Sequence, residues 1–304
     1  DEIRRIELPD MSCLELQFRG PQKAIALIID VKQTKTNQTG KQQYGVCIRS
    51  SDPLCCAVGA IAFWFFRRWE LDRSAPPDMK DNQSWFLDKL FNQKGDKTHA
   101  LNYQTHYAAF KKALQELGMA SSKKTHICRQ SGARMAEISG VEYSQIQRLG
   151  RWNSESLNSK YLTGVPIKAV RGVAGFVPDD MHYFLPRAIV DVDEALAKEI
   201  FPWVDQEDVK IQADVSLGRQ MVLSKVNFIN LMKYLRVVLI QDVAALWDIL
   251  EGHPIRNHPI FQGAAFQAFK SRLKDACSAA VDPQTASLHR LAPALIDHSR
   301  SQHQ

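Results

Sequence analysis

The stretch from Leu54 to Glu70 constrains the fold most, because its side chains are apolar nearly all round. It reads LCCAVGAIAFWFFRRWE, and Asp52-Pro53 before it has the residue types of a helix start, an N-cap acceptor followed by proline. A helix without a polar face must be buried. No run of eighteen apolar residues occurs in the chain, so this helix is predicted to lie inside a folded domain and not across a membrane. A chain of 304 residues, 45% of them hydrophobic, is long enough for one large domain or two ordinary ones.

Short alternating runs before this helix predict a small antiparallel sheet. One run holds Leu14, Leu16 and Phe18, and residues 24–30 and 44–49 form two more, the last two separated by the turn-rich segment 33–42. After the apolar helix, residues 71–98 are polar and are expected to form a loop anchored by aromatic side chains. Apolar spacing then predicts helices over 103–117, 127–139, 142–149, 155–162 and 261–277, a helical hairpin over 217–250, and core positions at Tyr107, Phe110 and Leu114. The predicted fold class is mixed α+β, mostly helical.

Cysteine usage favours a reduced, intracellular setting. The six cysteines, at positions 13, 47, 55, 56, 128 and 277, form no C-x-x-C pair and no grouping typical of metal ligands. We therefore expect neither a disulfide framework nor a metal site.

Four residues in the stretch 125–161 could together bind and cleave a phosphodiester. His126 and Arg129 lie three residues apart, Trp152 follows Arg129 by twenty-three residues, and Tyr161 follows Trp152 by nine. Alone, each is most often a packing residue or a solvated charge. As a set, Arg supplies a fork that matches phosphate oxygens, His and the Trp indole donate hydrogen bonds, and a Tyr hydroxyl can attack phosphorus.

Positive charge is concentrated around these residues. The window 121–171 carries nine Lys/Arg against three Glu, which gives +6 and equals the formal net charge of the whole chain. Such a window is either a solvated basic face or a nucleic-acid site, and its overlap with the phosphate-type residues favours nucleic acid. The side chains expected to contact DNA are Lys123, Lys124, Arg134, Arg148, Arg151 and Lys160.

The ordered pattern His-x-x-Arg, Leu-Gly-x-Trp and Tyr resembles box II of the tyrosine recombinases. The resemblance implies the recombinase catalytic fold, in which Tyr161 attacks a DNA phosphodiester to form a 3′-phosphotyrosyl bond while Arg129 holds the non-bridging oxygens. It further implies that His126 assists as hydrogen-bond partner or base, and that Trp152 donates to the phosphate. The implied partner is double-stranded DNA, bound by a homo-oligomer (dimer or tetramer), in a reaction that uses no cofactor.

Two further catalytic positions come from the same resemblance. Recombinases carry a catalytic Lys in the turn between their second and third strands, where this chain has Thr34-Lys35-Thr36. Lys35 is the expected residue and Lys41 the competing one, and without the resemblance either is an ordinary surface lysine. Glu2-Ile3 resembles the Glu-Leu of box I, so the box I Arg is expected two residues before Asp1.

The hairpin and the apolar helix resemble a narrower group. "KTNQTGKQQYG" followed by "SDPLCCAVGAIAFWFFRRWE", and later "AGF" and "YFLPRA", are similar to the Crypton-transposon recombinases and to their relative, the centromere-binding kinetochore subunit of budding yeast. The resemblance implies a nuclear protein. The expected domains are residues 1–176 for a recombinase-like catalytic and DNA-binding domain, 177–290 for a helical region, and 291–304 for a disordered tail.

Three functions remain open from the sequence. The first is an active Crypton-like recombinase, the second a non-enzymatic DNA-binding module on the same fold, as in the kinetochore relative, and the third a type IB topoisomerase. The His-x-x-Arg box and the hairpin argue against the topoisomerase. The presence of Lys35, His126, Arg129, Trp152 and Tyr161 together favours the recombinase. Residues 179–214 hold ten Asp/Glu against three Lys/Arg, which indicates either a solvated acidic segment or a surface that keeps non-specific DNA away.

Overall fold

A computed structural model describes residues 2–31, 43–80, 82–121, 124–152, 164–220, 222–280 and 282. Its elements near the N-terminus are α1 (Glu2–Arg5), η1 (Leu8–Asp10), β1 (Met11–Leu16), β2 (Ala24–Val31), β3 (Gln43–Cys47), η2 (Pro53–Cys55) and α2 (Ala57–Phe66), which continues into the π-helical turn η3 (Arg67–Leu71). Then follow α3 (Asn82–Trp85), β4 (Asn92–Gln93), β5 (Asp96–Ala100), α4 (Tyr103–Glu116), η4 (Lys124–His126), α5 (Ile127–Ile138), α6 (Tyr143–Gly150) and α8 (Ile167–Val173). The C-terminal part holds η5 (Pro186–Ala188), α9 (Glu194–Glu199), α10 (Trp203–Ser216), α11 (Leu223–Ala245), η6 (Pro254–Asn257), α12 (Pro259–Gln262) and α13 (Ala264–Ala279).

The sheet β1-β2-β3 is antiparallel and has a hydrophobic cluster on each face. Side chains alternate along a strand, so Met11, Leu27 and Cys47 face one cluster while Ala26 and Ile48 face the other. The first cluster packs the sheet against α2 and α11, and the second packs it against α8 and the segment that contains Tyr183 and Leu185. The mixed, mostly helical fold with a small antiparallel sheet is therefore confirmed.

The apolar helix lies where the sequence places it. Asp52 accepts a hydrogen bond from the Leu54 N–H, but it caps the short 3-10 helix η2 and not the apolar helix itself. The helix α2 begins at Ala57 with Cys56 as its N-cap, and its Val58, Ala62 and Phe65 are fully buried. The main cluster joins α2 to α11 and to residues as distant as Phe266 and Leu273 of α13. It takes residues from both of the first two expected domains, and the domain division itself stays a prediction.

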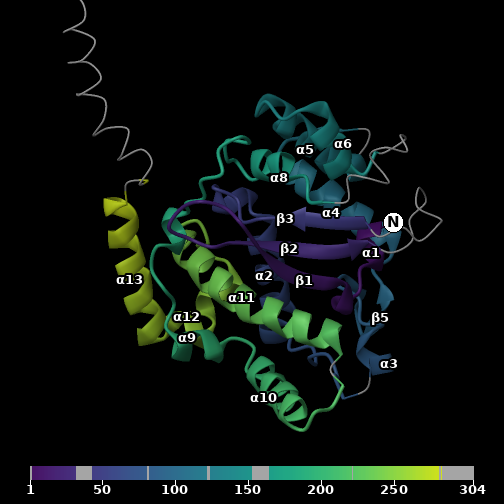
Figure 1. The fold of residues 1–304 in the computed structure, drawn as a ribbon, viewed down its shortest axis with the longest axis vertical. Helices are drawn as coiled ribbons and strands as arrows, with labels where there is room; N and C mark the ends of the chain where they lie inside the picture. The colour runs from purple at the N-terminus through teal and green to yellow at the C-terminus, as the bar shows by residue number, and fades with distance from the viewer. Residues whose placement is uncertain are drawn as a thin grey trace, which may run out of the picture.

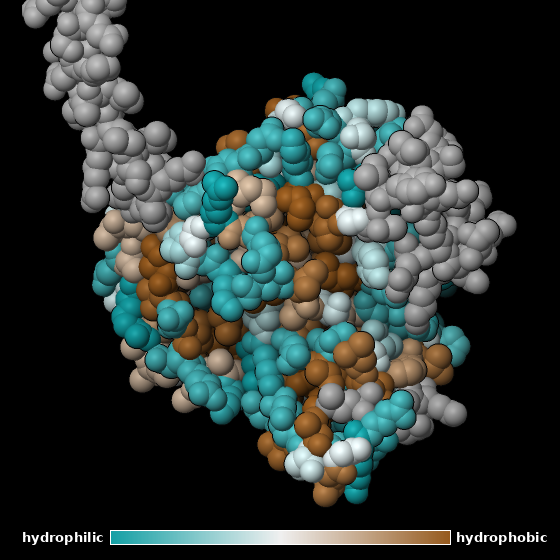
Figure 2. Space-filling model, viewed as in Figure 1, coloured by the Kyte–Doolittle hydropathy of each residue, from teal (hydrophilic) through white to brown (hydrophobic). Residues whose placement is uncertain are grey.

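A separate group of helices, α5, α6 and α8, lies at the top of Figure 1, while α10 forms the lower end of the molecule. The small cluster of Ala136, Val141, Ile146 and Ala169 holds the three helices together. Their visible surface is mostly hydrophilic, with smaller apolar areas between the polar residues (Figure 2). We call α5 and α6 the arginine lobe, because they contain Arg129, Arg134 and Arg148.

Three local expectations were wrong. Residues 92–100 form the β4–β5 hairpin, most of it within the predicted loop 71–98, with Gly95 at φ +81° in its turn. Residues 217–250 do not form a hairpin, because α11 is one helix of 23 residues. Its neighbour is α10, most of which lies in the acidic segment, and Asp205 and Asp208 of α10 pair with Arg236 and Lys233 of α11. On α4 only Leu114 is buried, whereas Tyr107 and Phe110 are half-buried. The expected helix over 155–162 and the expected tail over 291–304 lie outside the described residues.

Among the described residues, no helix is both long enough and apolar enough to cross a bilayer. All six cysteines are free thiols. The same residues contain no group of three or more His, Cys, Asp or Glu side chains placed to hold a metal ion.

Candidate nucleic-acid interface

Arg129 lies in the first turn of α5. His126 occupies the N-cap position and its side chain makes no capping hydrogen bond, so the first N–H groups of the helix lack the side-chain acceptor that caps commonly supply. The positive end of the helix dipole adds to the charge of Arg129 there. Both His126 and Arg129 are exposed. This end of α5 favours an anion.

A tight turn after α6 brings Trp152 to Arg129. Arg151 adopts the left-handed conformation at φ 55°, and the Trp152 N–H donates to the Gln147 carbonyl over 2.9 Å. The indole folds back over Gly150, where a Cβ atom would lie 2.6 Å from the ring. A side chain at position 150 would therefore displace the indole from this place.

The Arg129 guanidinium is held by two residues of this turn, Gly150 and Trp152. It donates to the Gly150 carbonyl, and its central carbon lies 5.0 Å from the centroid of the Trp152 ring. A cation–π contact at an exposed site contributes about 0.5–1 kcal/mol. A guanidinium has five N–H donors, so donors remain for a phosphate. Trp152 is 40% exposed, which leaves the indole accessible as well.

The other expected DNA contacts differ in their surroundings. Arg148 donates to the carbonyl of Gly164, the first described residue after position 152 in the sequence. Arg134 pairs with Glu137 over 2.7 Å, with both side chains more than 60% exposed. Arg151 forms the turn described above. Lys35, Lys41, Lys123, Lys160 and Tyr161 lie outside the described residues, and Lys124 is described only in its backbone.

Two residues of the basic window are not free cations. Arg171 is buried: it donates to the carbonyls of Val177 and His182 and packs against the rings of Phe18 and Phe176. Burial lowers the pKa of its guanidinium. Lys168 pairs with Asp179. The positive surface is accordingly smaller than the sequence window suggests.

The acidic segment is balanced by nearby cations. Asp205 pairs with Arg236 over 2.6 Å and Asp208 with Lys233 over 2.7 Å, both partners being on α11. Asp193 pairs with Arg272 of α13 over 2.7 Å. Much of the predicted acidic surface is therefore neutralised by neighbouring helices.

Tyr143 and Tyr183 are the tyrosines nearest to Tyr161 in sequence among the described residues, and they differ in accessibility. Tyr143 is 73% exposed, whereas Tyr183 is 2% exposed. Burial raises the pKa of Tyr183 to about 12. Tyr183 is therefore unsuited to act as a nucleophile.

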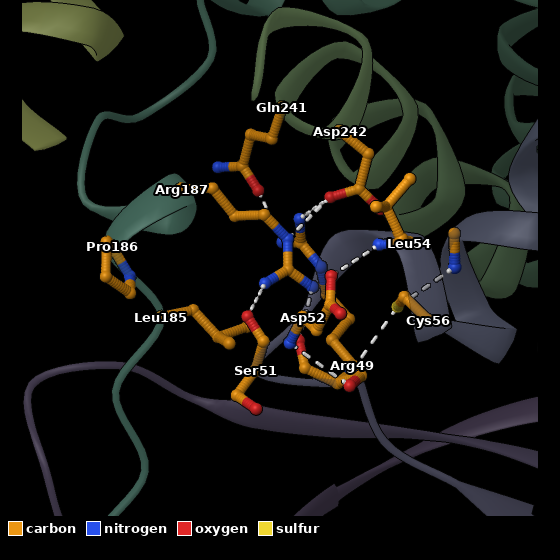
Figure 3. A network of polar contacts seen from close by, with 12 residues as sticks. Arg49, Ser51, Asp52, Leu54, Cys56, Leu185, Pro186, Arg187, Gln241 and Asp242 are labelled. Atoms are coloured by element: carbon orange, nitrogen blue, oxygen red, sulfur yellow. Dashed lines mark hydrogen bonds and ion pairs between the residues drawn. The ribbon is translucent and has the colours of Figure 1, made fainter. Parts of the chain in front are cut away.

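A buried charged cluster of Arg49, Arg187 and Asp242, shown in Figure 3, was not predicted from the sequence. Its members come from the segment after β3, from η5 and from α11, and no local spacing connects them. One signal was available, an Asp on the apolar helix α11, because a buried carboxylate requires a counter-charge.

A family model matches most of the chain. The model of the centromere DNA-binding protein complex CBF3 subunit, domain 2, matches residues 1–267. A search of curated proteins found no match. The family match agrees with the resemblance to the centromere-binding kinetochore subunit, whereas the resemblance to recombinases stays a prediction.

Proposed function

The chain belongs to the family of centromere DNA-binding CBF3 subunits, domain 2, and on that premise we propose that it binds double-stranded DNA in the nucleus as a non-catalytic module of a centromere-type complex. The match to 267 of the 304 residues is the observation that carries this proposal. The arginine lobe supplies the contact surface.

The geometry of Arg129 supports phosphate recognition there. Its guanidinium is fixed by the Gly150 carbonyl and the Trp152 ring, so less side-chain entropy is lost when a phosphate binds. The same ring offers a flat aromatic face and an N–H donor beside it. Arg148 adds a second guanidinium from α6. Such contacts position a duplex without reading its sequence.

Charge reversal tests the proposal. Changing Lys123, Lys124 and Arg148 to Glu should weaken binding to all duplex sequences alike, because phosphate contacts carry no sequence information. The matched control reverses Lys94, Arg219 and Lys274, which lie on the β4–β5 turn, after α10 and on α13. Equal losses in the two triple variants would show that binding depends only on net charge, and would contradict the lobe as the site.

A tyrosine recombinase is the second candidate, favoured by one observation. Arg129 and Trp152, twenty-three positions apart, converge in space as the recombinase pattern expects. In this function Tyr161 is the nucleophile, Lys35 the acid for the leaving oxygen and His126 the assisting base. A nicked duplex from which the cleaved fragment diffuses away should then trap a covalent adduct on Tyr161.

A further inference from the structure

The cluster of Arg49, Arg187 and Asp242 holds two buried guanidiniums against one carboxylate. Asp242 Oδ1 accepts from Arg49 Nη2 over 2.5 Å and from Arg187 Nε over 2.8 Å. Arg49 also donates to the Gln241 side chain over 2.5 Å. All three charged side chains are at most 5% exposed. Buried charges at this density are costly to break apart, so the elements they join are held rigidly.

Arg187 extends this cluster to the backbone of Ser50 and Ser51. Its Nη2 donates to the Ser50 carbonyl over 2.6 Å and its Nη1 to the Ser51 carbonyl over 3.1 Å, as Figure 3 shows for Ser51. Ser51 in turn contacts the end of α8. Its N–H donates to the Ala174 carbonyl over 2.8 Å, and its hydroxyl donates to the Gly175 carbonyl over 3.3 Å.

Glycine at 175 lets the end of α8 approach Ser51 closely. Gly175 lies at φ +81°, and a Cβ atom there would be 2.3 Å from the Ser51 hydroxyl oxygen. The contact between α8 and Ser51 is therefore close and directional.

The helix α8 joins the arginine lobe to the sheet. Ala169 belongs to the cluster shared with α5 and α6, whereas Val170 belongs to the cluster on the sheet. Ser139 of the lobe also donates to the Gly172 carbonyl, over 3.4 Å. A shift of the α8 end would accordingly move Arg129 and Arg148 together.

We propose that Arg187 is a positioning residue for DNA binding, because it holds Ser50 and Ser51 against Asp242 and so fixes the α8 end that carries the arginine lobe. The inference rests on the proposed DNA-binding function. Beyond that function, the inference states that the affinity for DNA depends on the buried cluster of Arg49, Arg187 and Asp242, although the cluster itself does not contact DNA.

Two glycine substitutions separate positioning from stability. Gly175→Ala brings a Cβ into contact with Ser51, whereas Gly252→Ala has a similar φ of +76° and no atom within 4 Å. Both variants should lower the urea midpoint of the whole chain, because alanine is strained at such φ values. Only Gly175→Ala should lose duplex affinity, by about tenfold.

The salt dependence of binding distinguishes a changed DNA contact from a loss of folded protein, because only the changed contact alters it. The slope of log K against log salt becomes shallower by about 0.9 for each phosphate that the protein no longer neutralises, but a smaller folded fraction leaves the slope as it was. Gly175→Ala and Arg187→Lys should both have a shallower slope than the wild type. Lysine keeps the charge of Arg187 and removes the fork that spans the two serine carbonyls.

Each outcome decides the question. Wild-type affinity and slope in Gly175→Ala and Arg187→Lys, alongside a lowered urea midpoint, would show that the cluster is structural only. If Gly175→Ala does not fold, Arg187→Lys alone carries the test, because it removes the fork that holds the Ser50 and Ser51 carbonyls. An unchanged slope in Arg187→Lys would then overturn the proposal. Absence of salt-dependent duplex binding by the wild type would instead refute the proposed function, and the inference with it.

Discussion

Asp242→Asn should destabilise the protein severely, because it removes the carboxylate that lies between two buried guanidiniums. Asparagine keeps the size of the side chain and an acceptor oxygen, but it removes the negative charge that faces Arg49 at 2.5 Å and Arg187 at 2.8 Å. Breaking a buried pair by removing one partner costs about 3–5 kcal/mol. Since domains are typically stable by about 5–15 kcal/mol, about a fifth or more of the free energy of unfolding should be lost.

Urea denaturation of Asp242→Asn measures this loss, and Asp193→Asn is the matched control. Asp193 pairs with Arg272 over 2.7 Å, but the two side chains are 60% and 51% exposed. An exposed pair contributes about 0–1 kcal/mol, so the control should lose no more than that. Similar losses in the two variants, each within about 1 kcal/mol of wild type, would refute the reasoning about the buried cluster.

Three other substitutions test separate parts of the molecule. Gly59→Ala should destabilise the protein by about 1–3 kcal/mol, because its Cβ would lie 2.3 Å from Asp242 Oδ2. Gly132→Ala, inside α5 with no atom within 4 Å, should stabilise it by about 0.5–1 kcal/mol. Urea denaturation measures both effects, and equal effects would contradict the close packing of Gly59 against Asp242. Burial raises the pKa of Asp88, so the stability linked to its neutral form is fully present below the unfolded pKa of about 3.9 and is lost as pH rises through the folded pKa. Asp88→Asn should therefore raise the free energy of unfolding at pH 7 and lose this advantage in acid, and a destabilised variant at pH 7 would show that the ion pair with Lys97 at 3.5 Å dominates. If the chain acts as a recombinase, Tyr161→Phe should abolish the covalent adduct with a nicked duplex and leave affinity nearly unchanged, while an adduct that persists would move the nucleophile to Tyr143, the exposed alternative.

The sheet and the apolar helix could be predicted because their signals are local. Alternation in β1 to β3 and the all-apolar character of α2 depend on neighbouring residues only. The β4–β5 hairpin was missed because its strands are short and polar, with Asn92, Gln93 and Asp96 in place of alternating apolar residues. Gly95 at the turn was the remaining cue.

The α10–α11 pair was misjudged because charge hid the helical pattern. Val204 and Ile211 are the buried positions of α10, and they are outnumbered by Asp and Glu residues whose partners lie on α11. Those ion pairs follow from the packing and leave no trace in the local sequence. The turn that follows α10 contains Gly218, at φ +66°, which is the second residue of the range 217–250 predicted as a hairpin.

For the candidate site, the contact between Arg129 and Trp152 was not itself predicted, and the expected role of each at a phosphate stays a prediction. The pattern placed both at one phosphate, and the structure adds that the indole stacks on the guanidinium over the Gly150 turn. That contact depends on the left-handed Arg151, a conformation that its residue type does not indicate. Asp242 on α11 indicates that a buried counter-charge is needed, but the sequence does not identify Arg49 and Arg187 as its partners, because the three residues meet only once the whole chain has folded.

The affinity of Arg129→Ala for duplex DNA, measured over a range of salt concentrations, tests the proposed role of the arginine lobe most directly. Arg219→Ala is its control, since Arg219 is also an exposed arginine but pairs with Asp214, outside the arginine lobe. We expect Arg129→Ala to weaken binding and to lower the salt slope by about 0.9, and Arg219→Ala to change neither. Wild-type affinity and slope in Arg129→Ala would show that the DNA-binding surface lies elsewhere on the molecule.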